Sequence, residues 1–415
     1  MAVITILSDS VFLPTGYSNQ SKLLAKYLRS KGHEIHYLAN GYNGATIDHA
    51  KLEDGTIFDY KIYGQKNQQY FADLISPHLK QTKSDIFLVL LDTFMLHGGN
   101  GWFLGTDTAP AQTFFWFPSD GGGGLPVGCD AILRKIDFPV AMAKYGQKQC
   151  KDYYDLKTNV IPHGTEPNRF YKLPDEQRAE AKKKWGLTGK FVVGVVARNQ
   201  PRKNLDRTLK SFYFLKNKVP NAVLFLHLDP DDPAQAFNMK RLISKYNLEN
   251  RVVFSGLNAQ KGFGWDELNE VYNAMDMFFL STSGEGFGIP IIEAMSCEIP
   301  VLATDYTTTQ ELVLDNNAGL GIDLASVDKR NFFEEDAKEY DKEVSSGTVT
   351  GGWEVERGYC DCQDAAKKIE FLYKNPQMCK EMGLNGRKAV LEKYDFNNII
   401  GPSWEKLMLK SIDGT

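Results

Sequence analysis

Two glutamates, Glu285 and Glu293, stand eight positions apart in the segment SGEGFGIPIIE, residues 283–293. A carboxylate accepts two hydrogen bonds side by side, which suits the neighbouring hydroxyls of a sugar or a ribose. Between the glutamates lie Gly286 and Gly288, which lack a Cβ and let backbone N–H groups approach a ligand closely. The pattern therefore predicts a site that binds hydroxyl groups on both sides of a glycine turn.

The glycine turn is expected to join a strand to a helix. Met277–Ser281 is a short apolar run that predicts a buried strand, and Pro290 is typical of the first turn of a helix. A glycine turn at a helix N-terminus binds anions such as phosphate. With Glu285 in the turn and Glu293 in the first turn of the helix, we predict a diphosphate ligand with a sugar at each end. The alternative is a surface glutamate followed by a helix-start glutamate that the helix dipole favours.

A second cluster of charge follows the predicted strand Phe191–Ala197. Arg198 and Lys203 come directly after this strand, and we expect them to hold the diphosphate, Arg198 by bidentate contacts and Lys203 as a point charge. Arg202, next to Lys203, is expected to face solvent. Gly16, in the loop that opens the first helix, gives a weaker signal for a backbone contact to the same phosphates.

Three other polar features have competing interpretations. Asp120 either contacts a substrate or caps a turn, and His163 is expected to shape a turn rather than to act as an acid or base. The segment Asp229-Pro230-Asp231-Asp232 resembles a metal-binding D-x-D motif, but Asp and Pro are strong turn formers, so we predict a turn. No metal site is predicted, and no cofactor is required.

The elements that position these residues alternate between strands and helices along the whole chain. Such alternation predicts parallel sheets with right-handed crossovers, and the 415 residues exceed the size of one core. We expect an α/β protein of two doubly wound, Rossmann-like domains, residues 1–170 and 171–396, facing each other across a cleft. Ligands bind at the carboxyl ends of parallel strands, so the cleft is the expected site. The strand candidates are Val3–Leu7, Ile35–Leu38, Ile86–Leu91, Gln112–Phe117, Phe138–Ala141, Asn159–Pro162, Phe191–Ala197, Ala222–Leu228, Arg251–Ser255, Met277–Ser281 and Pro300–Ala303.

Three further segments carry structural expectations. Residues 167–190 are charged and predict a solvated linker helix, and 329–361 predict an inserted loop or small subelement. The last helix, near 397–415, presents Trp404, Leu407 and Met408 on one face.

The composition sets limits on partners and location. A net charge of −4 gives no overall attraction to nucleic acid or to an anionic membrane. The start MAVITILSDS predicts a first strand rather than a signal peptide, and no apolar run is long enough for a transmembrane helix. Six scattered cysteines fit a reducing compartment, so we expect a cytoplasmic protein, with peripheral membrane contact left open.

Taken together, these motifs resemble the E-x7-E signature of retaining glycosyltransferases with the glycosyltransferase-B fold, specifically family 4. The resemblance covers most of the chain. The segments that carry it are Val160-Ile161-Pro162-His163-Gly164 with Phe170, Arg198 and Lys203, Tyr272-Asn273-Ala274-Met275-Asp276, Glu285 to Glu293, Asp305, and Glu311-Leu312-Val313.

The resemblance implies roles for individual residues. Glu285 and the amides of Phe287 and Gly288 would hold the donor sugar, and Glu293 the ribose. Arg198 and Lys203 would hold the diphosphate, with Gly16 contacting it from the N-terminal domain. The last helix would pack back on the first domain.

The chain also departs from the family pattern. Asp92 and Asp120 stand where a histidine is common, and the run Gly121–Gly124 is unusual and expected to be mobile. The roles of both aspartates therefore stay open.

The resemblance implies a metal-independent transferase that moves a sugar, with retention of configuration, from a nucleotide-diphosphate sugar to an acceptor. We expect Glu285, Arg198, Lys203 and Asp120 to carry the reaction. The base is open between UDP and GDP, and the acceptor is open among glycan, lipid, protein, small molecule and modified nucleic acid. Two alternatives remain: a nucleotide-sugar 2-epimerase, which needs no acceptor, and a non-catalytic binding relative.

Overall fold

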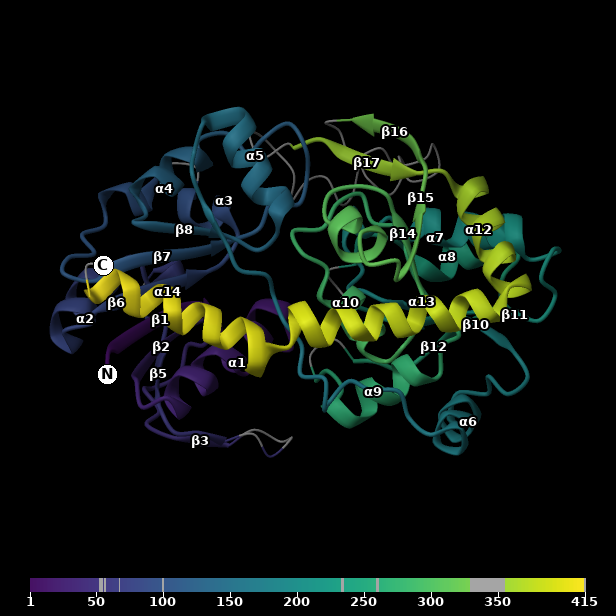
Figure 1. The fold of residues 1–415 in the computed structure, drawn as a ribbon, viewed down its shortest axis with the longest axis horizontal. Helices are drawn as coiled ribbons and strands as arrows, with labels where there is room; N and C mark the ends of the chain where they lie inside the picture. Colours follow the sequence, from purple (N-terminus) through teal and green to yellow (C-terminus); the bar gives the residue numbers. More distant parts are fainter. Residues whose placement is uncertain are drawn as a thin grey trace. The chain divides into compact units, whose positions relative to one another are not determined.

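The structure is a computed structural model that describes residues 1–51, 55, 57–66, 68–98, 101–232, 235–258, 261–328 and 355–413. The chain forms two compact units. The first comprises Met1–Ser119, Gly123–Gly164 and Asp395–Thr415, and the second comprises Asp120–Gly122 and Thr165–Tyr394. Each unit is built on a parallel sheet with helices between its strands, so the predicted α/β class with two Rossmann-like domains is confirmed (Figure 1).

The first unit contains a seven-stranded parallel sheet in the order β5-β2-β1-β6-β7-β8-β9. Its strands are β1 (Val3–Asp9), β2 (Glu34–Asn40), β5 (Lys61–Gly64), β6 (Ile86–Leu90), β7 (Gln112–Phe117), β8 (Phe138–Ala141) and β9 (Asn159–Val160). A two-stranded ribbon, β3 (Ala50–Lys51) with β4 (Ile57–Phe58), lies apart from this sheet.

The second unit contains a six-stranded parallel sheet in the order β12-β11-β10-β13-β14-β15. Its strands are β10 (Phe191–Val196), β11 (Ala222–His227), β12 (Val252–Phe254), β13 (Met277–Leu280), β14 (Val301–Thr304) and β15 (Gly319–Ile322). A separate antiparallel pair joins β16 (Leu324–Asp328) to β17 (Arg357–Cys360). In both sheets the strand order reverses beside the first strand of the unit, which creates a switch point between β1 and β6 and another between β10 and β13.

The helices connect the strands as the predicted crossovers require. They are α1 (Gly16–Ser30), α2 (Ile75–Thr82), α3 (Thr93–His97), α4 (Cys129–Lys135), α5 (Lys144–Tyr154), α6 (Asp175–Lys184), α7 (Leu205–Leu215), α8 (Met239–Lys245), α9 (Trp265–Asn273), α10 (Ile289–Ser296), α12 (Cys362–Lys374), α13 (Pro376–Ala389) and α14 (Gly401–Asp413). Helix α6 falls in the segment predicted as a solvated linker, and Ala181 is its buried residue.

Buried apolar side chains form both faces of each parallel sheet. All five residues of β6 and all four of β13 are buried, as expected for parallel strands that are covered on both faces. Helix α1 begins where Thr15 accepts a hydrogen bond from the Ser18 amide, and it ends before Gly32, whose φ of +89° suits glycine. These local rules explain why the predicted helix and strands form where they do.

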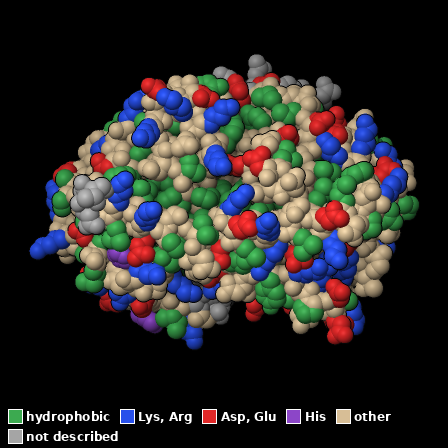
Figure 2. Space-filling model, in the orientation of Figure 1, with side chains coloured by type: hydrophobic (Ala, Val, Ile, Leu, Met, Phe, Trp, Pro, Cys, Tyr) green, Lys and Arg blue, Asp and Glu red, His purple; other side chains and the backbone are tan. Residues whose placement is uncertain are grey.

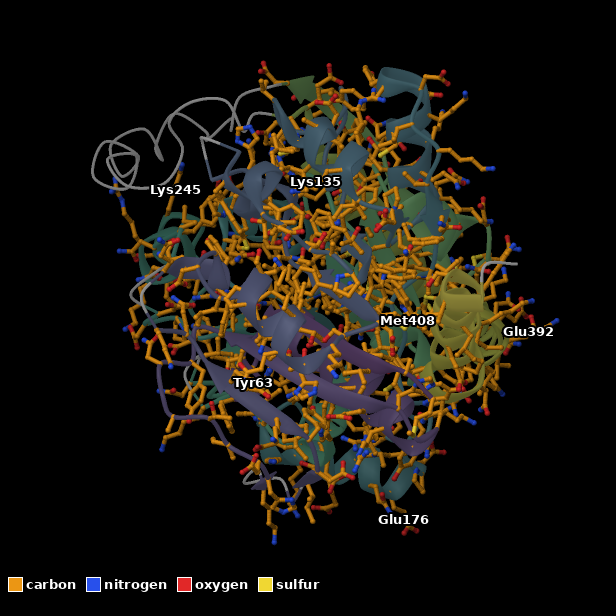
Figure 3. The ribbon with its side chains drawn as sticks, turned by 90° about the vertical axis from the view of Figure 1, so that its left-hand side faces the viewer. Tyr63, Lys135, Glu176, Lys245, Glu392 and Met408 are labelled. Atoms are coloured by element: carbon orange, nitrogen blue, oxygen red, sulfur yellow. The ribbon has the colours of Figure 1, made fainter. Side chains whose placement is uncertain are left out.

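The last helix packs within the first unit. The buried Trp404 ring lies 5.0 Å from the Trp116 ring, and Met408, labelled in Figure 3, is also buried. In Figure 1 this helix, α14 in yellow, lies beside α1, and the Tyr27 hydroxyl donates to Glu405 over 3.1 Å. The apolar face expected around Trp404 is therefore the face that the helix buries.

The surface carries mixed charge. Figure 2 shows Lys and Arg side chains interspersed with Asp and Glu across the face it draws, in keeping with the net charge of −4. Among the described residues, no helix has both the length and the apolar character needed to cross a bilayer. Of the predicted insertion at 329–361, residues 329–354 lie outside the described part of the chain.

Candidate active site

Several residues that are predicted to bind phosphate and sugar lie close together at the switch point of the second unit. Strands β10 and β13 pair in parallel, so the loops that follow them, 197–204 and 281–288, leave the sheet at the same edge. The second loop holds the first through a hydroxyl and a backbone amide. Ser281 Oγ donates to the Asn204 carbonyl over 2.9 Å, and the Ser283 amide donates to the Arg202 carbonyl over 2.7 Å. The sequence Ser281-Thr282-Ser283 thus holds the cationic loop, residues 197–204, against the glutamate turn, residues 281–288.

Glu285 lies between two cations. Its Oε1 is 2.6 Å from Lys203 Nζ, and its Oε2 is 2.9 Å from Arg202 Nη1. Its own amide donates to Thr307 Oγ1 over 3.0 Å. The two loops therefore bring Glu285 and Lys203 together, as the sequence predicted, and both side chains are buried.

The charges in this cluster depend on one another. Burial alone would raise the pKa of Glu285, but Arg202 and Lys203 outweigh it and lower the pKa to about 2. Burial and the neighbouring Arg202 lower the pKa of Lys203 to about 8, against the opposing effect of Glu285. At pH 7 the carboxylate is ionised and most of the lysine is protonated, so the site holds a charged pair away from water.

One expectation about residues 198–204 is wrong. Arg202 does not face solvent, because its guanidinium binds Glu285 and 29% of its side chain is exposed. Arg198 is 55% exposed, with its Nε 3.4 Å from Asp232 Oδ2, and its contact with a diphosphate stays a prediction. Between Arg198 and Lys203 in the sequence, the buried Asn199 donates to the Phe237 carbonyl over 2.8 Å and accepts the Phe237 amide over 3.1 Å.

Glu293 lies on α10 and faces a buried tyrosine. It is the fifth residue of the helix, so it stands in the second turn and not in the first turn as expected. The Tyr272 hydroxyl donates to Glu293 Oε2 over 2.6 Å. Burial raises the pKa of Glu293 to about 7, and the hydrogen bond from Tyr272 only partly opposes this. Glu293 is therefore poised to lose or gain a proton near neutral pH.

The glycine turn between the glutamates has the geometry expected of an anion site. Gly288 precedes α10 with φ of +109°, and a Cβ there would meet Ile291 at 2.9 Å, so only glycine fits. Gly286 is half-buried, whereas the Phe287 ring is buried against Tyr394, with 5.9 Å between ring centroids. The α10 N-terminus therefore directs its partial positive charge toward the same edge of the sheet.

Asp120 belongs to the second unit and joins the same cluster. Its Oδ2 lies 3.7 Å from Arg202 Nε and 3.4 Å from Arg357 Nη1. The sequence does not indicate a role for Arg357, at the start of β17, because this residue belongs to no motif and lies 237 positions from Asp120. The sequence also does not predict Tyr272 and Thr307 as hydrogen-bond partners of the two glutamates, although Tyr272 stands in a segment that carries the family resemblance.

The run Gly121–Gly124, expected to be mobile, is held in place. Gly122 exchanges two backbone hydrogen bonds of 2.9 Å with Glu356, and a Cβ on Gly121 would lie 2.3 Å from Val355. In the first unit, the Gly124 amide donates to the buried Gln149 over 3.0 Å. Close packing therefore requires a glycine at position 121, where a Cβ would also lie 2.7 Å from the Glu356 carbonyl oxygen.

The remaining candidates lie at the switch point of the first unit or outside both switch points. Gly16 is exposed at the start of α1, and its contact with a phosphate stays a prediction. Asp92, after β6, accepts a hydrogen bond of 2.6 Å from the Tyr17 hydroxyl. His163 is buried against Trp116, burial lowers its pKa to about 3, and this favours the turn-shaping role over acid–base chemistry.

The D-x-D segment forms a turn. Asp229 Oδ1 accepts the Asp231 amide over 2.9 Å, Asp231 pairs with Lys240, and Asp232 faces Arg198. Within the described ranges, no group of three or more His, Cys, Asp and Glu side chains is arranged to hold a metal ion. The requirement for a metal stays a matter for experiment.

Known families and structures resemble the chain in sequence and in fold. Residues 177–331 match the family model described as Glycosyl transferases group 1. The mannosylfructose-phosphate synthase of Agrobacterium fabrum is 28% identical over 42% of this chain and 38% of its own length. The GDP-mannose-dependent alpha-(1-6)-phosphatidylinositol monomannoside mannosyltransferase of Mycolicibacterium smegmatis is 29% identical over 49% of this chain and 54% of its own.

The fold match is broader than the sequence match. The sucrose-phosphate synthase of Thermosynechococcus elongatus superposes with a TM-score of 0.74 over 100% of both chains, at 16% identity. In sequence, the chain spans about half the length, or less, of the curated relatives named above. The expected resemblance to glycosyltransferases of the glycosyltransferase-B fold is confirmed, and the residues that match the group 1 glycosyl transferase model, 177–331, include Lys203, Glu285 and Glu293.

Proposed function

We propose that the protein is a retaining glycosyltransferase that takes a sugar from a nucleoside diphosphate sugar. The observation that carries the proposal is the buried arrangement of Lys203, Glu285 and Glu293 around the N-terminus of α10. One carboxylate stands before the glycine turn and the other follows it. This order matches a ligand whose diphosphate lies between two hydroxyl-bearing rings.

Each residue has a specific role in this proposal. Glu285 accepts hydrogen bonds from the donor sugar, together with the amides of Phe287 and Gly288, and Glu293 accepts them from the ribose. Lys203 and the α10 N-terminus bind the diphosphate. Arg198 is exposed at the edge of this site and forms a salt bridge with Asp232. It can therefore reach the phosphates only by leaving Asp232.

Donor binding exchanges the partners of Lys203. In the ligand-free site Lys203 neutralises Glu285, but Arg202 also binds Glu285, through its other oxygen. Lys203 can therefore move to the diphosphate without leaving a buried carboxylate unpaired, which would be costly. As the bond between the anomeric carbon and the diphosphate breaks, Lys203 and the helix N-terminus stabilise the negative charge that develops on the leaving group.

We further propose GDP-mannose as the first donor to test. Both relatives named above carry mannose in their names, and one is named as dependent on GDP-mannose. UDP-glucose serves as the comparison donor, because the residues that bind phosphate and ribose do not distinguish the two bases. Glycans and lipids are the acceptors to test first, since the GDP-mannose-dependent relative is named for a phosphatidylinositol glycolipid.

The test combines binding with turnover. The thermal unfolding temperature is measured with GDP, UDP, GDP-mannose and UDP-glucose; a ligand at 100 times its Kd adds about 2.7 kcal/mol to the free energy of unfolding. Turnover is then followed by NMR with glycan and lipid acceptors, with and without EDTA. We expect a product with the anomeric configuration of the donor and no effect of EDTA.

Three outcomes would contradict parts of the proposal. An isomeric nucleotide sugar formed without an acceptor would indicate an epimerase. Donor binding without turnover across the acceptor panel would indicate a non-catalytic relative. Inverted product, or activity that requires added Mn²⁺, would overturn the mechanism but leave the donor site standing.

A further inference from the structure

Strand β17 ties the end of the 329–361 segment to the candidate donor site. Its Gly358 amide donates to the Ser283 carbonyl over 3.0 Å, and the preceding Glu356 exchanges two backbone hydrogen bonds with Gly122. The Tyr306 hydroxyl also donates to the Glu356 carbonyl over 3.0 Å. The strand is thus held between the turn that carries Glu285 and the segment that carries Asp120.

Arg357 starts a chain of alternating charges that ends at Glu285. Its Nη1 donates to the Asp120 carbonyl over 2.6 Å and lies 3.4 Å from Asp120 Oδ2. The same Oδ2 is 3.7 Å from Arg202 Nε, and Arg202 Nη1 is 2.9 Å from Glu285 Oε2. Each charge in this chain faces one of opposite sign, and 17% of the Arg357 side chain is exposed.

Gly284, which precedes Glu285, packs against the Asp120 carbonyl that Arg357 holds. A Cβ on Gly284 would lie 1.9 Å from the Asp120 carbonyl oxygen and 3.3 Å from Arg357 Nη1. Only glycine therefore fits beside the carbonyl that Arg357 holds. Because Gly284 immediately precedes Glu285, moving the Asp120 carbonyl would move the turn that presents Glu285.

We propose that Arg357 is a positioning residue of the donor site, acting on Glu285 through Asp120 and Arg202. The inference rests on the proposed function. Arg357 keeps Arg202 on Glu285 when Lys203 moves to the diphosphate, so the carboxylate stays aimed at the donor sugar. Its effect therefore falls on the sugar half of the donor and spares the nucleotide half, which Glu293 holds.

The experiment compares two affinities in each protein. The Kd of GDP and of GDP-mannose, and of UDP and UDP-glucose, are measured by titration calorimetry for the wild type, Arg357→Ala and Arg357→Lys. The control is Arg178→Lys, because Arg178 also holds backbone carbonyls of the second unit, at Asn273 and Met275. These residues precede β13, whereas the Glu285 turn follows it.

We expect Arg357→Ala to reduce the affinity for the nucleotide sugar about tenfold, which is the effect of one charged hydrogen bond. The nucleotide sugar tested is the one that binds the wild type. The affinity for the nucleoside diphosphate should fall by less than about twofold. Arg357→Lys should recover most of the loss, since one cationic nitrogen makes both contacts to Asp120. Asp120→Asn, which keeps the carbonyl but removes the charge between the arginines, should act in the same direction if Arg357→Ala fails to fold. The control should leave both affinities unchanged.

Two results would overturn the inference. One is an unchanged affinity for the nucleotide sugar in both Arg357→Ala and Asp120→Asn. The other is an equal loss of both affinities with a lower unfolding temperature, which would make Arg357 a structural staple. A wild type that binds none of the four ligands would refute the proposed function itself, and this outcome is distinct from the other two.

Discussion

The two units present different chemistry at equivalent places in the same kind of sheet. At the β10–β13 switch point of the second unit, Lys203 and Glu285 form a buried ion pair of 2.6 Å. At the β1–β6 switch point of the first unit, the half-buried Asp92 accepts a hydrogen bond from Tyr17. Phe12, which follows β1, and Phe94, which follows β6, are 39% and 38% exposed.

The difference shows that the loops, and not the sheets, decide what each unit can bind. A buried ion pair costs desolvation energy and is weak evidence for stability, so its presence in the second unit points to a ligand. At the switch point of the first unit, the exposed Phe12 and Phe94 accompany the half-buried Asp92.

The largest effect should follow from removing Lys203. In Lys203→Ala we expect turnover with the donor to fall about 10²–10³-fold, because the leaving diphosphate loses its buried cation. Lys240→Ala is the control, since Lys240 pairs with Asp231 at the surface of the same unit. A loss smaller than about tenfold in a steady-state assay would remove Lys203 from the mechanism.

An intermediate effect should follow from Tyr272→Phe. The variant loses the hydrogen bond that lowers the pKa of Glu293, so that pKa should rise further above its usual range. We expect the affinity for the nucleoside diphosphate to fall about tenfold at pH 7, as measured by calorimetry, and to recover at higher pH. No recovery at higher pH would show that protonation of Glu293 is not the cause.

The pH dependence of the wild type tests the same carboxylate. Burial raises the pKa of Glu293 to about 7, and the ribose needs the ionised form. The affinity for the nucleoside diphosphate should therefore rise about fivefold from pH 6 to pH 8, because Lys203 is already half deprotonated at pH 8. Binding at pH 7 should release a proton, detectable as a heat that depends on the buffer. Above about pH 8 the affinity should fall as Lys203 loses its proton, because its pKa is about 8. A flat profile would contradict both assignments.

The smallest effect should come from the matched tyrosine of the first unit. Tyr17 donates to Asp92 over 2.6 Å, the same length as the Tyr272 bond to Glu293. We expect Tyr17→Phe to change the affinity for nucleotide and nucleotide sugar by less than about twofold, while altering turnover with an acceptor. A loss of donor affinity equal to that of Tyr272→Phe would erase the contrast between the units.

Much of the fold follows from local patterns in the sequence. Strands such as Ile86–Leu90 are continuous apolar runs, which predict buried parallel strands directly. The missed strands lack this signal: Lys61–Gly64 is short and partly polar, and Gly319–Ile322 contains two glycines. Their conformation comes from pairing with neighbouring strands, which periodicity does not reveal.

The sequence predicts the parts of the candidate site that follow neighbouring parallel strands, and it misses partners that no motif or strand order brings together. Glu285 and Lys203 meet because two loops leave one sheet edge, a consequence of the strand order. The sequence predicts a solvent-facing Arg202 because its partners are distant in the chain: Asp120 lies 82 positions before it and Glu285 lies 83 positions after it. Only tertiary packing brings such groups together.

The most direct test of the donor site separates its two glutamates. GDP and GDP-mannose, or UDP and UDP-glucose, are titrated into Glu285→Gln and Glu293→Gln by calorimetry, with circular dichroism to verify folding. We predict that Glu293→Gln weakens nucleotide and nucleotide sugar by the same factor, whereas Glu285→Gln weakens the nucleotide sugar alone. Equal losses in both variants, or the reverse pattern, would contradict the assignment of sugar to Glu285 and ribose to Glu293.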